Sequence, residues 1–159
     1  MTALEYIKGD LFQAGSGRLK PSILAHACNP FGKWSAGVAC TFRSKCPQAY
    51  ALYVNHCNNN SDLLGTCFLV NPHNGKPIVA CLFTNDFKQR PDRIVEYTES
   101  AIRDLATQLA SMNVERDADG LPVVHMPRIN SGLFRVPWEH SEEVLLQCPS
   151  LAFRVYVLG

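Results

Sequence analysis

The sequence of 159 residues lacks several features that mark large classes of protein. It has no run of lysine or arginine and a formal net charge of only +1, so a nucleic-acid groove that works by general electrostatics is not expected. No apolar run approaches the length of a membrane span, and the first residues lack the pattern of a signal peptide. We therefore expect a soluble protein of the cytoplasm or nucleus, with neither a nucleic-acid nor a membrane partner.

Internal repeats, low-complexity segments and linkers are also absent from the sequence. A chain of this length and of ordinary globular composition can bury one hydrophobic core. We predict a single domain over residues 1–159, and a monomer whose partner is an anionic small molecule.

The cysteines do not form a recognisable disulfide or metal pattern. There are seven of them, none in a CxxC pair, and most lie inside apolar segments. His56 and Cys57 are adjacent, but no second cluster with zinc spacing accompanies them. We expect buried, reduced thiols, and neither a metal nor another cofactor.

Strand-like runs and helical patterns alternate along the chain. Short apolar runs predict strands at Leu4–Lys8, 22–27, 66–70, Ile78–Phe83, Val123–Met126 and 153–157, and helical spacing predicts helices at 38–54, 92–112 and Trp138–Leu146. Pro47 marks a break or a new start within the first helical pattern. The strands at 66–70 and Ile78–Phe83 are separated by a short turn-rich connection and should pair. This alternation predicts an α/β sandwich with buried central strands under helices.

Two loops of small and polar residues have the composition of phosphate-binding loops. Residues 29–37 follow an apolar strand and precede a helical pattern, and residues 129–137 do the same further along the chain. Small residues leave backbone N–H groups uncovered, and a following helix adds its positive N-terminal end. Ligands of such folds bind beyond the carboxyl ends of the strands. We therefore expect the two loops to face each other and hold a diphosphate.

Three motifs in order now resemble a known family. Gly9-Asp10-Leu11 after the first strand, Asn29 with the run Ser-Ala-Gly-Val-Ala at 35–39, and Asn-Ser-Gly-Leu-Phe at 130–134 resemble the macrodomain family. The narrower runs at 26–39, 81–84 and 126–138 look like the yeast-type ADP-ribose 1''-phosphate phosphatases. The resemblance covers nearly the whole chain.

This resemblance implies a three-layer fold with a mixed, six-stranded central sheet between helices. It implies binding of ADP-ribose across the strand ends and removal of the 1''-phosphate from ADP-ribose 1''-phosphate, a by-product of tRNA splicing. Two alternatives remain open: hydrolysis of mono-ADP-ribose from acidic side chains of proteins, and a non-catalytic ADP-ribose reader. The protein-directed branch uses a lysine and an aspartate where this chain has Asn85 and Phe134.

The resemblance also gives individual residues a role, each with a structural alternative. Asp10 would accept a hydrogen bond from the adenine amine, or would only cap the turn after Gly9. Asn29 would bind the distal ribose, or would form an Asx turn. Trp34 would cover the pocket mouth or pack on the surface, and Phe134 would lie against the distal ribose or fill the core. Tyr156 would stack on adenine or belong to the core.

The expected substrate contacts come from the first strand end and from both loops. They are Gly9, Asp10, Leu11, Ala27, Cys28, Asn29, Trp34, Ser35, Ala36, Gly37, Val38, Ala39, Ile129, Asn130, Ser131, Gly132, Leu133, Phe134 and Arg135. Phosphate monoester hydrolysis needs a group that moves a proton, and imidazole titrates near working pH. His26 lies three residues before Asn29, and the yeast-type phosphatases that the chain resembles have a histidine at this position, so we predict His26 as the catalytic residue. Its structural alternative is a histidine whose ring is satisfied within the core. Asp86 and Asp92 are weaker candidates, because both suit surface positions.

Overall fold

The computed structural model describes residues 3–14, 20–71 and 76–157. Six strands, four α-helices and one 3-10 helix lie within these ranges. The strands are β1 (Leu4–Lys8), β2 (Ile23–Cys28), β3 (Cys67–Val70), β4 (Ile78–Phe83), β5 (Val123–Met126) and β6 (Ala152–Val157), and the helices are η1 (Leu11–Gln13), α1 (Gly37–Lys45), α2 (Pro47–Asn59), α3 (Pro91–Leu109) and α4 (Trp138–Leu146). Most of the turn-rich connection predicted between the strands at 66–70 and Ile78–Phe83 lies outside the described residues, including His73.

The six strands form one mixed sheet, as predicted. Their order is β1-β6-β5-β2-β4-β3, and all neighbours run parallel except β3, which pairs antiparallel with β4. The central strands β2, β4 and β5 are apolar almost throughout because both faces of the sheet are covered. The predicted pairing of the runs at 66–70 and Ile78–Phe83 is confirmed.

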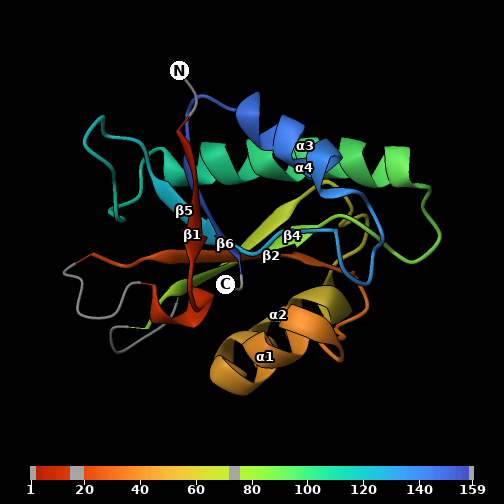
Figure 1. The fold of residues 1–159 in the computed structure, drawn as a ribbon. Coiled ribbons are helices and arrows are strands. Elements are labelled where there is room, and N and C mark those ends of the chain that lie inside the picture. Colours follow the sequence, from red (N-terminus) through yellow and green to blue (C-terminus); the bar gives the residue numbers. More distant parts are fainter. Residues whose placement is uncertain (1–2, 15–19, 72–75, 158–159) are drawn as a thin grey trace.

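Helices cover both faces of the sheet. In Figure 1, α3 and α4 lie on one face, and α1 and α2 lie on the other. Side chains of β2 alternate between the two cores: Ile23 and Ala25 pack in the α3/α4 core, whereas Leu24 and Cys28 pack in the α1/α2 core. The three-layer α/β architecture that the sequence predicts is therefore present.

Pro47 divides the first helical pattern, as the sequence suggests. Helix α1 ends at Lys45, and α2 begins at Pro47 after the single linking residue Cys46. Proline suits the first position of a helix, where its missing N–H costs no hydrogen bond.

Among the described residues, no helix has the length and apolar character of a membrane span.

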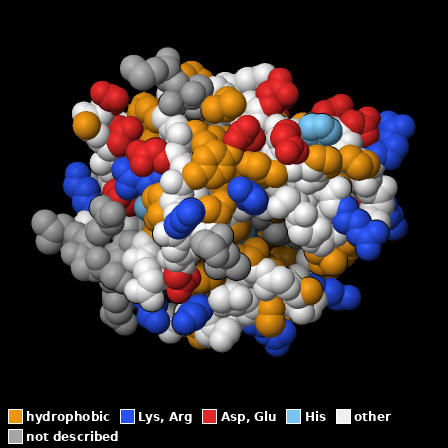
Figure 2. Space-filling view, viewed as in Figure 1, with side chains coloured by type: hydrophobic (Ala, Val, Ile, Leu, Met, Phe, Trp, Pro, Cys, Tyr) orange, Lys and Arg blue, Asp and Glu red, His pale blue; other side chains and the backbone are white. Residues whose placement is uncertain are grey.

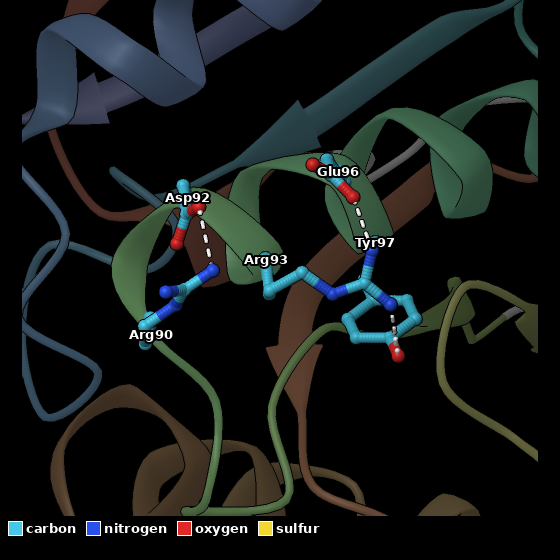
Figure 3. A network of polar contacts seen from close by, with 5 residues as sticks. All are labelled: Arg90, Asp92, Arg93, Glu96 and Tyr97. Atoms are coloured by element: carbon cyan, nitrogen blue, oxygen red, sulfur yellow. Dashed lines mark hydrogen bonds and ion pairs between the residues drawn. The ribbon is translucent and has the colours of Figure 1, made fainter.

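Helix α3 begins at Pro91 with polar contacts on its solvent side. Figure 3 shows the exposed ion pair of Arg90 with Asp92 (3.3 Å) and the contacts of Arg93 with Glu96 and Tyr97. Asp92 thus lies at the surface in the first turn of α3, paired with Arg90, which agrees with the surface position expected as its alternative to catalysis. The helix ends at Leu109, three residues before the predicted end.

The connections after β2 and β5 leave the sheet in opposite directions. These two strands are parallel neighbours, but the chain passes from β2 to α1 on one face and from β5 to α4 on the other (Figure 1). Such a reversal opens a crevice beyond the carboxyl ends of the strands, where ligands of open α/β sheets bind. The fold therefore brings the two predicted phosphate loops to one crevice.

Candidate active site

A cavity of about 240 Å³ lies in this crevice, between the loops that follow β2 and β5. Most of the predicted substrate contacts line it. They are Ala27, Cys28, Asn29, Trp34, Ser35, Ala36, Gly37, Val38 and Ala39 on one side, and Ile129, Asn130, Ser131, Gly132, Leu133 and Phe134 on the other. The expectation that the two loops face each other is confirmed by this lining.

Asn29 anchors the loop that follows β2. Its Nδ2 donates to the carbonyl of Lys33 (2.8 Å), and its Oδ1 accepts from the backbone N–H of Phe31 (2.9 Å). The hydroxyl of Tyr53 also donates to Asn29, at 2.5 Å to its carbonyl and 3.1 Å to Oδ1. The Asx turn is thus present, and it leaves one Nδ2 hydrogen for a ligand. The ribose contact of Asn29 stays a prediction.

The N-terminus of α1 faces the cavity without a side-chain cap. Ala36 occupies the N-cap position and makes no capping hydrogen bond, and Gly37 begins the helix at φ +61°. The first N–H groups of a helix lack partners within the helix and carry partial positive charge. Ser35, Ala36 and Gly37 are exposed and small, so an anion can approach these N–H groups closely.

Asn130 anchors the loop that follows β5. Its Oδ1 accepts from the hydroxyl of Thr84 (2.9 Å), and its Nδ2 donates to the hydroxyls of Thr98 (2.9 Å) and Ser141 (3.2 Å). Its backbone has φ +65°, a left-handed conformation that asparagine tolerates better than most residues. The residue is 5% exposed, and its side chain points into the protein. Asn130 therefore shapes the loop through its side chain.

The two helices that follow the crevice loops differ in charge. Helix α4 carries Glu139, Glu142 and Glu143, whereas α1 carries Arg43 and Lys45 and has no acidic residue. Figure 2 shows acidic side chains gathered over α4 and lysine and arginine side chains on the lower part of the same face. Within the cavity lining itself, Lys33 after β2 and Arg128 after β5 offer positive charge to an anion from both sides.

Below the cavity wall lies a buried cluster around His26. The His26 ring is fully buried and stacks on Phe42 with the ring centres 4.0 Å apart. It meets Trp34 edge-on at 4.7 Å, and its Nε2 lies 3.5 Å from the sulfur of Cys28. Trp34 and Cys28 line the cavity, but His26 does not. The structure thus places His26 one layer behind the wall.

Comparison with known proteins agrees with this geometry. The family model Macro domain matches residues 25–145. The chain belongs to the macrodomain family. The ADP-ribose 1''-phosphate phosphatase of Lodderomyces elongisporus is 46% identical over 158 residues, which cover 98% of each chain. The protein of the same name from Candida albicans is 43% identical over 155 residues, covering 98% of this chain and 99% of the relative.

The solved structures support the same fold. The macrodomain of Mycobacterium tuberculosis DarG matches with a TM-score of 0.76, over 100% of both chains and at 19% sequence identity. At that identity the similarity shows a shared fold.

Some predicted contacts of this macrodomain lie outside the cavity. Gly9, Asp10 and Leu11 follow β1, at the same carboxyl end of the sheet as the cavity. In the sheet order β1 lies three strands from β2, which is ~14 Å at normal strand spacing. Asp10 accepts from the N–H of Phe12 (2.9 Å) and caps η1, which is its structural alternative. Arg135 is exposed and also lies outside the lining. Ligand contacts of these residues stay predictions.

Four residues of the lining were not predicted from the sequence: Lys33, Phe87, Pro127 and Arg128. Phe87 is 53% exposed, has φ +69°, and lies between Phe31 (6.1 Å) and Phe134 (5.8 Å), with distances between ring centres. A bulky residue in the left-handed region is a sign of a functional constraint. Lys33 lies within the first predicted loop and Arg128 directly precedes the second, and their charge at a phosphate loop was an available signal.

Two expectations about aromatic residues can be judged by burial. Neither alternative for Trp34 is met: its indole is fully buried and stacks on Tyr53, so it forms part of the cavity wall and neither covers the mouth nor packs on the surface. Tyr156 lies on β6 and is half-buried against the core between the sheet and α1/α2, as its structural alternative states. Its hydroxyl is 2.8 Å from Nδ1 of His125. His125 in turn contacts Glu115 at 2.8 Å through Nε2.

The buried thiols have strongly shifted pKa values. Burial raises the pKa of Cys28, but the hydrogen bond with Cys81 and the contact with His26 outweigh burial and lower this pKa to about 5. The pKa of Cys81 lies well above its usual value because this thiol is buried and adjoins Cys28. Of the two neighbouring thiols, Cys28 therefore ionises first. All seven cysteines are free, but only Cys28, Cys67 and Cys81 are buried. The expectation of buried thiols is therefore wrong for the exposed Cys40 and only partly met by the other three.

The other candidates for acid–base chemistry have structural roles. Asp86 accepts from the N–H of Lys88 (3.0 Å) and from the side chain of Gln89 (3.1 Å), outside the cavity. Asn85, which stands where the protein-directed branch has its lysine, is 5% exposed and accepts from the N–H of Phe87 (2.9 Å).

We predict that Asn130→Ala lowers the free energy of unfolding by about 2–4 kcal/mol, since it removes three buried hydrogen bonds and places alanine in a left-handed conformation. Urea denaturation measures the effect. Ser131→Ala is the matched control: it removes one exposed bond, from Ser131 to the carbonyl of Arg128, and should cost about 1 kcal/mol or less. Equal losses in the two variants would contradict the anchoring role of Asn130.

Proposed function

We propose that this macrodomain hydrolyses ADP-ribose 1''-phosphate to ADP-ribose and inorganic phosphate. Two findings together support the proposal: the names of similar proteins and the cavity between the motif loops. Relatives with this name match the chain at 43–46% identity over almost its full length, and the loops that carry the family motifs enclose a cavity built for an anion. We further propose tRNA splicing as the source of the substrate, and ADP-ribosylated proteins as secondary partners.

The cavity offers three kinds of group that stabilise phosphate. The uncapped N-terminus of α1 presents backbone N–H donors, the loop after β5 presents a second set of small residues, and Lys33 and Arg128 add positive charge. Such donors are worth more in a crevice than in bulk water, because they are oriented before the ligand arrives. The ring of Phe134, which lines the cavity, would contact an apolar face of the distal ribose.

The reaction transfers a phosphoryl group to water. The oxygen of water bonds to phosphorus, the bond from phosphorus to the 1''-oxygen breaks, and that oxygen gains a proton as ADP-ribose leaves. Charge on the phosphoryl oxygens would be held by the α1 N–H groups and the two cations. Positioning and charge stabilisation of this kind supply most of the catalysis in phosphoryl transfer.

His26 enters this mechanism indirectly. A group that moves the proton must touch the reacting atoms, but the His26 ring is fully buried and is not part of the cavity wall. His26 does contact Trp34 and Cys28, and both of these residues form part of the cavity wall. We therefore treat His26 as a positioning residue that supports the wall.

The protein-directed hydrolase is the less favoured alternative. Its lysine position holds Asn85, a buried turn residue, and its aspartate position holds Phe134 at the rim of the cavity. Neither side chain can act as a nucleophile or a base. A reader of ADP-ribose would share the cavity but would release no phosphate.

We predict that the wild-type protein releases phosphate from ADP-ribose 1''-phosphate, and that Ala36→Glu lowers kcat/KM at least about tenfold. The new carboxylate would repel the phosphates at the start of α1, a loss of about 1.4 kcal/mol or more. Ala36→Gln is the matched control, with the same shape and no charge, and should lose much less. A phosphate-release assay measures all three proteins.

The outcomes separate the functions. Tight ADP-ribose binding without phosphate release would contradict the phosphatase and favour a reader. Equal losses in Ala36→Glu and Ala36→Gln would contradict the electrostatic role of the α1 N-terminus. Loss of folding does not explain a selective effect of Ala36→Glu, because an acidic group at a helix N-terminus is favourable.

For His26 we predict that His26→Ala lowers kcat/KM by about tenfold or more, because a gap behind the wall lets Trp34 and Cys28 move. His26→Phe fills the gap and keeps an aromatic ring on Phe42, so it should recover most of the rate. Circular dichroism checks that both variants fold. If His26→Phe is as inactive as His26→Ala, the ring nitrogens take part in proton transfer and the indirect role is wrong.

A further inference from the structure

Three phenylalanine rings form a row at the cavity. Phe31 follows β2, Phe87 follows β4 and Phe134 lies in the loop after β5, and these three strands are neighbours in the sheet. The rings of Phe31 and Phe87 are nearly parallel, with an angle of 17° and centres 6.1 Å apart. Phe87 meets Phe134 edge-on, at 79° and 5.8 Å. Phe87 and Phe134 line the cavity, whereas Phe31 does not.

The ring of Phe87 is not part of the folded core. It is 53% exposed, and Phe31 beside it is 50% exposed. Neither residue belongs to the core on either face of the sheet. An aromatic side chain that stays this exposed leaves apolar surface in contact with water, which costs free energy. Apolar surface that is gathered at a cavity is typical of a ligand-binding site, whereas single exposed residues are ordinary.

The backbone at Phe87 is also strained. Its φ of +69° lies in the left-handed region, which a bulky side chain rarely adopts. The bond that holds this turn goes from the backbone N–H of Phe87 to Oδ1 of Asn85 (2.9 Å), so it does not need the ring. Asparagine or glycine would occupy the same conformation at lower cost. The strain therefore places a ring at the cavity without a gain in core packing.

We propose that Phe87 is a specificity-determining residue of this cavity, whose ring binds the distal ribose of ADP-ribose and so distinguishes a nucleotide sugar from a plain nucleoside diphosphate. The inference rests on the proposed function, in which the phosphates lie between residues 35–39 and 129–134 and the distal ribose lies against Phe134. Because the ring of Phe87 contacts that of Phe134, a sugar on one ring meets the other as well.

The chemistry of these rings suits the sugar and not the phosphates. A phenylalanine ring has a negative face and no hydrogen-bond donor, so it does not stabilise an anion. The donors and cations of the cavity are the N–H groups at the start of α1, Lys33 and Arg128. A ribose ring has C–H groups on its faces and hydroxyl groups around its edge. Its faces can therefore cover aromatic carbon while its hydroxyl groups remain hydrogen-bonded.

The test compares the binding of ADP-ribose and ADP by calorimetry, which requires no turnover. The wild type should bind ADP-ribose at least about tenfold more tightly than ADP, because ADP has no second sugar to cover the rings. Phe87→Asn removes the ring and suits the left-handed turn. It should weaken ADP-ribose binding at least about fivefold and change ADP binding less than about twofold. Phe87→Tyr keeps the ring and should preserve the preference for ADP-ribose.

Two controls separate a binding role from a structural one. Phe87→Asn should unfold at the same urea concentration as the wild type or a higher one, because it relieves strain and removes an exposed ring. Leu52→Asn is the matched surface variant. Leu52 is 47% exposed on α2 and lies outside the cavity lining, so its replacement should leave the affinity for both ligands unchanged.

Two results would overturn the proposal. One is equal affinity of the wild type for ADP-ribose and ADP. The other is an equal weakening of both ligands in Phe87→Asn, which together with a lower urea midpoint would assign the ring a structural role. Phosphate release from ADP-ribose 1''-phosphate is measured separately. Selective binding without release contradicts the phosphatase alone, and release without selective binding contradicts the role of Phe87 alone.

Discussion

Two asparagine side chains hold the loops on either side of the cavity, and the shape of the site depends on them. Asn29 ties the loop after β2 to itself and to Tyr53 of α2, and Asn130 ties the loop after β5 to the end of β4 and to α3 and α4. Each amide is used mainly inside the protein. Fixed side chains leave the backbone N–H groups and small residues of the loops as the surface that a ligand meets, which is the arrangement that suits phosphate.

The fold explains why this surface lies at a crevice. Because β2 and β5 are parallel neighbours whose following helices cover opposite faces, their loops separate and the space between them remains open. The uncapped start of α1 and two cations then line this space, which is the basis of the proposed affinity for anions. The same β2 also carries His26 and Cys28 into the α1/α2 core, so one strand serves both the cavity wall and the buried cluster behind it.

Much of this could be predicted from the sequence because its signals are local. Apolar runs and helical spacing predicted β4, β5 and α4 with their observed bounds, and the two small-residue loops predicted the cavity lining. The remainder depends on tertiary contacts. Burial of His26 arises from packing against Phe42 of α1, and the position of Phe87 depends on a turn held by Asn85. The contact of Cys28 with Cys81 depends on the register of β2 and β4, which no single segment specifies.

The central claim is that the loops after β2 and β5 hold the phosphates of ADP-ribose. The most direct measurement is an NMR titration of the ¹⁵N-labelled protein with ADP-ribose, following the backbone amide signals. The account predicts the largest shifts at residues 35–39 and 129–134, with little change in β3 at the far edge of the sheet. Shifts concentrated away from these two loops would contradict it.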